Sequence, residues 1–429
     1  MSRSFWFLLY NVLGIPLQYA GFQFLRLFSS KVRKGVAGRK HLWETLDGFR
    51  ESRNPDRPLY IVHCASLGEY EMAKPVIEGL RRDRPDSDII LTFFSPSGLE
   101  KVDNSSGADL ITYLPFDSVR QITRFYQMLR PDKLILVSYE IWPNLIWIAE
   151  RYRVETSLIS ARYQGSGMRS RRILESFYRA VYSSLTYLYP ISPEDEAQFQ
   201  RCLNGEDGPQ IKTLGNPRFD RVLSRARQNG QTHLLPASFN HSPTIIAGSI
   251  WPADERKILS QLIRIIRSYP ELRIILAPHE PTASHIESLE EWAAENGLIS
   301  GRFSTVQELQ QEARVLIIDS IGHLAELYHH CDIAYIGGGF SGSVHNVMEP
   351  AVARTAVLFG PDHHNSYEAE QLLDSGGGFS VDSGDEFGRK IRSLLQNPPE
   401  LQQVREQAYR VIREHAGAAE RTVQQLLST

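Results

Sequence analysis

The sequence predicts an α/β protein with two parallel-sheet domains that face each other across a cleft. Two observations indicate this fold class: β-type runs alternate with amphipathic stretches, and the alternation forms two series separated by a polar stretch at residues 227–242. The chain has 429 residues, 42% of them hydrophobic, which is enough for two or three domains with sizeable cores. We therefore expect an N-terminal segment at residues 1–40, one domain at 41–226 and a second at 227–429.

The predicted strands follow from the β-type runs. The first series lies at residues 59–63, 88–94, 110–114, 133–137 and 155–159, and the second at residues 244–248, 272–277, 315–319, 332–337 and 356–359. Helical patterns lie between them, for example at residues 71–82, and the last helix is expected to pack back on the first domain. Such alternation produces parallel sheets, which bind ligands beyond the carboxyl ends of their strands.

Composition excludes several classes of protein. The three cysteines, Cys64, Cys202 and Cys331, are widely spaced and form no CxxC pair. This pattern argues against a disulfide framework or a structural zinc site and fits a reducing compartment. The formal net charge of -3 gives no overall basic character, so we expect no nucleic-acid partner.

The N-terminal segment is apolar and is followed by basic residues. Ser4 to Leu25 contains no charged residue, and the first 58 residues carry a formal charge of +6 whereas the rest carry -9. The uncharged stretch reaches the roughly 20 residues that a spanning helix needs, although Pro16 weakens such a helix. We expect a membrane anchor, spanning or monotopic, that leaves the following domain on the cytoplasmic side. A helix packed in the protein's own core is the alternative.

Glu69 is a candidate general base. It follows the predicted strand at 59–63 and lies beside Gly68, so a substrate hydroxyl can approach its carboxylate closely. The structural alternative is a glutamate that complements the dipole at the start of a helix. Glu71 is the neighbouring carboxylate most easily confused with it.

A glycine-rich turn follows the predicted strand at 332–337. Gly337, Gly339 and Gly342 match GxGxxG, which is typical of dinucleotide-binding folds. We reject that interpretation because the turn comes late in its domain and the next strand does not end in an acidic residue. The turn instead indicates a sugar-nucleotide pocket whose backbone N–H groups meet a phosphate. A tight turn without a ligand is the alternative.

Residues between and after the strands complete the candidate set. Arg218 lies between the two series, where a guanidinium can reach a departing phosphate without a metal ion, or can form a salt bridge that closes the domains. The histidine pairs His329-His330 and His363-His364 do not indicate a metal site, because adjacent side chains diverge and neither HExxH nor DxD is present. We expect no metal ion.

In their order along the chain, these motifs resemble those of the bacterial transferases of 3-deoxy-D-manno-oct-2-ulosonic acid (Kdo). The resemblance extends over nearly the whole chain. It is carried by HCASLGEYE (63–71), FFSPSGLEKV (93–102), LPFD (114–117), YEIWPNLI (139–146), SARY (160–163), GNPRFD (215–220), APHEP (277–281), DSIGHLAELY (319–328), GGGF and HNVMEP within 337–350, and GPDHHN (360–365).

This resemblance implies a GT-B fold and an inverting, metal-independent glycosyltransferase. It implies transfer of Kdo from CMP-Kdo to the glucosamine disaccharide of the lipid A precursor (lipid IVA) on the cytoplasmic side of the inner membrane, with no cofactor beyond the donor. Glu69 is then the general base, and Arg218 stabilises departing CMP. The implied CMP pocket consists of Pro278, His279, Ile321, Gly322, His323, Asn346, Val347, Met348 and Glu349.

Three positions depart from the family pattern. Many members have an acidic residue where this chain has Ser138, a lysine where it has Arg218, and an arginine where it has His279. The first departure removes a carboxylate thought to help the transition state, and the third weakens the charge near the nucleotide.

Two other functions are retained as alternatives. One is a GT-B enzyme that uses a UDP-sugar on a lipid or cell-wall precursor, which protection by CMP or by UDP would distinguish. The other is a membrane-docked nucleotide-binding module without catalysis, against which the presence of both Glu69 and Arg218 argues.

Overall fold

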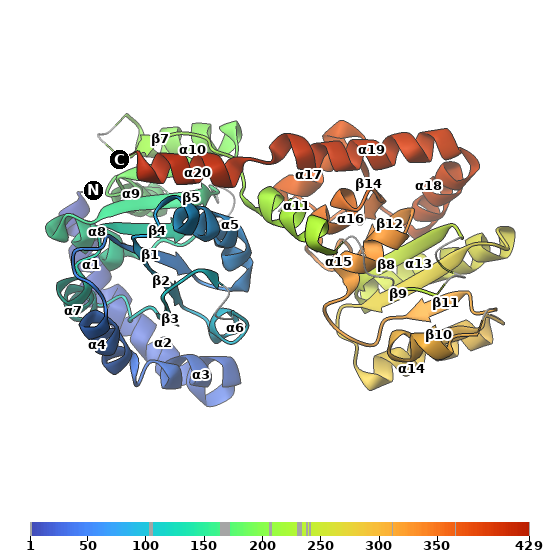
Figure 1. The fold of residues 1–429 in the computed structure, drawn as a ribbon, viewed down its shortest axis with the longest axis horizontal. Helices are drawn as coiled ribbons and strands as arrows, with labels where there is room; N and C mark the ends of the chain where they lie inside the picture. The colour runs from blue at the N-terminus through green and yellow to red at the C-terminus, as the bar shows by residue number, and fades with distance from the viewer. Residues whose placement is uncertain are drawn as a thin grey trace. The chain divides into compact units, whose positions relative to one another are not determined.

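The computed structural model contains two compact units, each built on a seven-stranded parallel sheet (Figure 1). Unit 1 comprises Met1–Arg221 and Ala416–Thr429, and unit 2 comprises Val222–His415. The structure describes residues 2–428 except 103–105, 164–171, 206–207, 230–233, 237–238, 240–241, 311 and 365. The predicted fold class, α/β with two parallel sheets, is confirmed.

The sheet of unit 1 has the order β3-β2-β1-β4-β5-β6-β7. Its strands are β1 (Leu59–Cys64), β2 (Asp88–Phe93), β3 (Leu110–Tyr113), β4 (Lys133–Val137), β5 (Glu155–Ala161), β6 (Tyr187–Pro190) and β7 (Gln210–Ile211). Every residue of β1, β2 and β4 is buried, as their continuous apolar runs require for strands covered on both faces. The chain changes direction across the sheet between β1 and β4, and such switch points are where parallel sheets bind ligands.

Helices cover both faces of this sheet. They are α1 (Arg3–Leu9), η1 (Tyr10–Gly14), α2 (Ile15–Phe28), α3 (Ser30–Gly38), α4 (Leu42–Ser52), α5 (Leu67–Asp83), α6 (Pro96–Leu99), α7 (Val119–Leu129), α8 (Pro143–Ala149), η3 (Glu150–Tyr152), α9 (Arg172–Tyr182), α10 (Pro193–Leu203) and α20 (Ala418–Leu427). The C-terminal helix α20, red in Figure 1, packs on α5. A Cβ atom at Gly79 would come within 2.7 Å of the Val423 side chain, so the glycine permits this close approach.

The N-terminal segment is divided between packed and exposed residues. Trp6 is buried, the Tyr10 hydroxyl donates to Asp117 at 3.0 Å, and Asn11 hydrogen-bonds to Asn144 at 2.9 Å, so this part packs on unit 1. In contrast, α2 has no buried residue. Large apolar side chains are exposed along the segment: Phe5, Leu8, Val12, Leu13, Leu17, Tyr19, Phe24, Leu25, Leu27 and Phe28. None of the helices in the described residues combines the length and the apolar character that crossing a bilayer requires.

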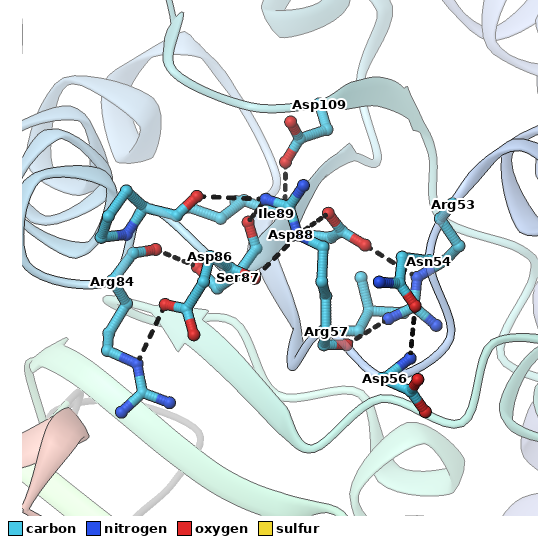
Figure 2. A network of polar contacts seen from close by, with 12 residues as sticks. Arg53, Asn54, Asp56, Arg57, Arg84, Asp86, Ser87, Asp88, Ile89 and Asp109 are labelled. Carbon is cyan, nitrogen blue, oxygen red and sulfur yellow. Dashed lines mark hydrogen bonds and ion pairs between the residues drawn. The ribbon is translucent and has the colours of Figure 1, made fainter.

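A network of charged side chains lies at the edge of the unit 1 sheet where the strands begin (Figure 2). The Asp88 carboxylate, at the start of β2, accepts from Arg53 at 2.9 Å and lies 3.2 Å from the Arg57 guanidinium. Arg57 also donates to backbone carbonyls of the loop before β2, including that of Asp86 at 2.7 Å. Because Arg53 and Asp88 are nearly buried, this pair holds the loops before β1 and β2 together.

Unit 2 repeats the architecture with the sheet order β10-β11-β9-β8-β12-β13-β14. Its strands are β8 (Thr244–Ile250), β9 (Arg273–Pro278), β10 (Ser300–Arg302), β11 (Val315–Ile317), β12 (Ile333–Ile336), β13 (Ala356–Phe359) and β14 (Gly378–Ser380). Its helices are α13 (Pro252–Ser268), α14 (Ala283–Glu295), η5 (Phe303–Glu308), α15 (Leu324–Leu327), η6 (Tyr328–His330), α16 (Met348–Val352), α17 (Tyr367–Ser375), α18 (Gly384–Gln396) and α19 (Pro398–His415). The switch point of this sheet lies between β8 and β12.

The ten predicted strands are all present, with ends shifted by at most a few residues. The sequence did not predict four further short strands of the two sheets: β6, β7, β10 and β14. The helix α11 (Arg218–Asn229) continues into the stretch expected to be a linker, so residues 227–229 are helical. Phe219 and Val222, three residues apart, are both buried and give this helix an apolar face, whereas the polar residues that follow indicate a linker.

Candidate active site

Glu69 lies in the first turn of α5, directly after β1 and next to the switch point of unit 1. Its Oε2 accepts hydrogen bonds from the Ser66 backbone N–H at 2.7 Å and from the Ser66 hydroxyl. Burial raises the pKa of the Glu69 carboxyl above its ordinary value, the Ser66 hydrogen bonds oppose this rise, and the negative charge of Glu140 adds to it. The carboxylate therefore has a helix-capping contact, as the structural alternative predicts, and also the electrostatic character of a proton acceptor.

Glu140 brings a second carboxylate to this edge of the sheet, from the loop after β4. Its Oε2 accepts from the Trp142 indole N–H at 2.7 Å and lies 3.6 Å from the Nε2 atom of buried His63. The other ring nitrogen of His63, Nδ1, lies 3.0 Å from the Thr92 hydroxyl. Glu140 belongs to the YEIWPNLI motif, but the sequence did not indicate that its charge would reach Glu69.

Two buried serines end neighbouring strands at the same edge. Ser138 follows β4 and Ser160 lies near the end of β5, and both have positive φ, of 64° and 51°. Both hydroxyl groups are buried and have no hydrogen-bond partner among the described residues. The departure at Ser138 thus leaves an unpaired hydroxyl group at the edge of the sheet that carries Glu69 and Glu140.

Glu71 is held in an ion pair, whereas Arg218 forms none within the part of the chain that the structure describes. The Glu71 carboxylate accepts from Arg221 at 2.7 Å, so the carboxylate most easily confused with Glu69 is held in an ion pair. Arg218 begins α11, and its backbone N–H donates to the Asn216 side chain at 3.0 Å. Its guanidinium forms no ion pair with any residue that the structure describes and is partly exposed.

A stack of three rings lies at the carboxyl edge of the second sheet. Trp251 follows β8, His279 follows β9, and His345 follows the glycine-rich turn after β12. The Trp251 indole N–H donates to His345 Nε2 at 2.8 Å, and these two rings are nearly coplanar, with an interplanar angle of 13°. The His279 ring stacks on both, with centroids 4.3 Å from Trp251 and 4.4 Å from His345.

The hydrogen bond from Trp251 defines the protonation of His345. An indole N–H can only donate, so Nε2 of His345 must accept and the neutral ring carries its proton on Nδ1. Burial lowers the pKa of His345, the neighbouring His279 lowers it further, and Asp254 opposes this. His345 therefore presents an N–H donor rather than a fixed positive charge. The sequence did not identify Trp251, because nothing in its local pattern distinguishes it from a core tryptophan.

The remaining predicted pocket residues also follow strands of unit 2. Pro278 ends β9, and Ile321 is 82% exposed beside Gly322, whose φ of 106° favours glycine. The His323 ring packs on Phe303, with centroids 4.9 Å apart.

The segment after the glycine-rich turn offers both side chains and backbone. The Asn346 side-chain oxygen accepts from the Met348 backbone N–H at 3.1 Å, and Glu349 lies 3.5 Å from Arg225. The side chains of Val347 and Met348 are buried, so only their backbone could meet a ligand.

Two backbone N–H groups of the glycine-rich turn already have hydrogen-bond partners within the protein. The N–H of Gly338 donates to Asp254 at 2.9 Å, and that of Gly342 donates to Asp362 at 3.1 Å. A Cβ atom at Gly337 would lie 2.2 Å from the Ser249 carbonyl oxygen. Close packing thus explains the glycine at 337, and two backbone N–H groups expected to meet a phosphate are already bonded to carboxylates.

The expectation that adjacent histidine side chains diverge is wrong for His363 and His364. Their Nδ1 atoms lie 3.0 Å and 3.2 Å from the same Glu370 oxygen, Oε1, because the backbone turns between β13 and α17. These three side chains form the one group within the described residues whose atoms are close enough together to suggest a metal ligand set. That no metal ion takes part in the reaction stays a prediction.

Comparisons with known proteins agree with the motifs. The family model described as 3-deoxy-D-manno-octulosonic-acid transferase (kdotransferase) matches residues 40–221. A 3-deoxy-D-manno-octulosonic acid transferase of Haemophilus influenzae is 25% identical over 388 residues, 89% of this chain and 90% of the relative. One of Aquifex aeolicus is 29% identical over 346 residues, 79% of this chain and 87% of the relative. The chain thus resembles Kdo transferases over most of its length, and its residues 40–221 match the Kdo transferase family model.

A solved structure supports the two-unit α/β fold. The UDP-GlcNAc 2-epimerase from Neisseria meningitidis, bound to UDP-GlcNAc, aligns with a TM-score of 0.63 and 14% sequence identity. The alignment covers 87% of this chain and 100% of the epimerase. At this identity the likeness concerns the GT-B arrangement of two parallel-sheet units and not the chemistry.

Proposed function

We propose that the protein is an inverting glycosyltransferase that moves Kdo from CMP-Kdo to lipid IVA. The names of its relatives support the reaction, and the observation that carries the mechanism is the carboxylate of Glu69. It lies at a switch point with its pKa raised by burial, and no ion pair among the described residues neutralises it. The neighbouring Glu71, by contrast, is paired with Arg221.

The proposed reaction is a single displacement. A glucosamine hydroxyl of the acceptor transfers its proton to Glu69 while its oxygen attacks the anomeric carbon of Kdo. The bond between that carbon and the phosphate oxygen of CMP breaks, and CMP leaves with the bonding electrons. Glu140 assists by keeping the proton affinity of Glu69 high, since its own charge disfavours a second negative charge nearby.

We assign stabilisation of the leaving group to Arg218. A guanidinium offers paired N–H donors that match a phosphate, and the partly exposed Arg218 side chain has no competing carboxylate among the described residues. The donor nucleotide is assigned to the pocket residues of unit 2, where Trp251 and His345 position His279 and the Nδ1–H group of His345 supplies a neutral donor.

Peripheral attachment to the cytoplasmic face of the inner membrane completes the proposal. The exposed apolar residues of α2 and the basic residues that follow form a surface suited to anionic lipid. The acceptor is itself an anionic glycolipid, so the same surface brings enzyme and substrate together.

Mass spectrometry of tetraacylated lipid IVA tests the reaction. The detergent-extracted protein is incubated with acceptor and preformed CMP-Kdo, with and without EDTA, and with CMP or UDP as competitor. We expect a gain of one or more Kdo masses that survives EDTA and is inhibited by CMP but not by UDP. No mass gain, with intact CMP-Kdo present, would reject Kdo transfer, and inhibition by UDP alone would favour a UDP-sugar enzyme.

Membrane attachment is tested by replacing exposed residues of α2. The triple variant Leu17→Gln, Phe24→Gln and Phe28→Gln removes three largely exposed apolar side chains, two of which pack their rings on each other, and leaves Trp6 in the core. We expect that this variant no longer floats with anionic vesicles in a flotation assay, while its circular dichroism spectrum is the same as that of the wild type. Retention on the vesicles at the wild-type level would refute the role of α2.

A further inference from the structure

An apolar groove lies in unit 1 beside α3. Its volume is about 250 Å³. Residues from α2, α3 and the loops after β2 and β3 form its apolar walls: Phe22, Val32, Val36, Phe94, Pro96 and Phe116. The rings of Phe94 and Phe116 each lie within 6 Å of Phe22, so aromatic faces line much of the groove.

A buried arginine underlies these aromatic faces. The Arg39 guanidinium lies 4.7 Å from the ring of Phe94 and 4.9 Å from that of Phe116. Its three nitrogens donate to the backbone carbonyls of Leu114, Gly35 and Phe94, at 2.8 to 2.9 Å. Burial lowers the pKa of Arg39 to about 10. The charge is thus compensated by carbonyl groups and ring faces, and the groove offers an apolar surface rather than an anion site.

The groove connects to the candidate catalytic carboxylates through one aromatic contact. The rings of Phe94 and Trp142 have centroids 4.5 Å apart. The Trp142 indole N–H donates to Glu140, whose charge raises the pKa of Glu69. Phe94, Glu140 and Glu69 follow β2, β4 and β1, so the groove lies at the same carboxyl edge of the unit 1 sheet as the two carboxylates.

One exposed lysine gives the rim of the groove a positive charge. Lys31 lines the groove, is exposed, and forms no ion pair within the part of the chain that the structure describes. The exposed apolar surface of α2 adjoins it, since α2 and α3 are in contact. An apolar groove with a cationic rim, next to a surface suited to lipid, is complementary to an anionic lipid and not to a soluble sugar.

We propose that this groove binds one acyl chain of the glycolipid acceptor and so positions the sugar hydroxyl near Glu69. The inference rests on the proposed function and deepens it by assigning a subsite to the acceptor's lipid part. Each methylene buried in such a groove contributes about 0.8 kcal/mol of transfer free energy, so several buried methylenes would dominate acceptor affinity.

Filling the groove tests the proposal. Val32→Trp places a large side chain inside it, and Val36→Trp, one helical turn later, does the same as a second variant. Ala37→Trp is the matched control, because Ala37 is exposed on the same helix and does not line the groove. Initial rates are measured with tetraacylated lipid IVA and with the deacylated disaccharide bisphosphate, each at saturating CMP-Kdo.

We expect both groove variants to raise the KM for tetraacylated acceptor about tenfold, the effect of excluding roughly two methylenes. The KM for the deacylated acceptor and for CMP-Kdo should stay at the wild-type value, which also shows that the variants fold. Equal behaviour of the groove variants and Ala37→Trp would overturn the proposal. A matching rise in KM for the deacylated acceptor would overturn it too, since the groove would then serve the head group. A wild-type protein that transfers Kdo to neither acceptor would instead reject the proposed function.

Discussion

Replacing Glu69 by glutamine separates catalysis from helix capping. The amide oxygen of glutamine can still accept the two Ser66 hydrogen bonds, but it cannot take a proton from the acceptor. Loss of a general base lowers turnover by about 10²–10⁴, equivalent to about 2.7–5.4 kcal/mol of transition-state stabilisation. Loss of the negative charge from the first turn of α5 lowers the free energy of unfolding by only about 0.3–1 kcal/mol. Turnover should therefore fall much further than stability.

The assay combines turnover by mass spectrometry with thermal melting. Glu69→Gln should lower the Tm by about 1–4 °C, in line with its small stability cost. The matched control is Glu71→Gln on the same helix, which breaks the partly exposed ion pair to Arg221 and should leave turnover near the wild-type value. Turnover of Glu69→Gln above about a tenth of wild type, or an equal loss in Glu71→Gln, would refute the assignment of the base.

Two further predictions concern proton affinity and stability. Activity should rise with pH as Glu69 loses its proton, so Glu140→Gln, which removes a charge that raises the Glu69 pKa, should move the acid limb of kcat/KM to lower pH. Ser66→Ala removes a hydrogen bond that favours the carboxylate and should move the limb to higher pH; shifts in the same direction would contradict the electrostatic account. Asp88→Ala leaves nearly buried Arg53 unpaired and should cost about 3–5 kcal/mol in denaturant unfolding, whereas Asp86→Ala, at an exposed ion pair, should cost less than about 1 kcal/mol. Equal costs would show that burial does not determine the strength of these pairs.

The sequence predicted the strands well where a strand is buried on both faces. The β1 and β2 runs are continuous apolar segments, and such segments admit few other structures. The missed strand β7 has two residues, neither of them buried, so it leaves no apolar signal. Strand order was not predicted, because pairing depends on contacts between distant segments.

The candidate site was predicted residue by residue but not as an arrangement. Glu69 could be found because it follows a strand and a glycine. The ring stack of Trp251, His279 and His345 could not, since the three residues come from three separate loops and only the sheet brings them together. The electrostatic influence of Glu140 on Glu69 depends in the same way on the adjacency of β1 and β4.

Because α20 belongs to unit 1, one cut in the chain cannot separate the two units. Unit 2 is an insertion in the chain of unit 1, which it leaves after Arg221 and rejoins at Ala416. Val423 and Leu426 belong to the apolar core that also contains residues of β1, β2 and β4. A fragment that stops at Arg221 would expose that core, whereas residues 222–415 form one continuous segment. Unit 1 must therefore be expressed with its last fourteen residues rejoined, for example through a short linker in place of unit 2.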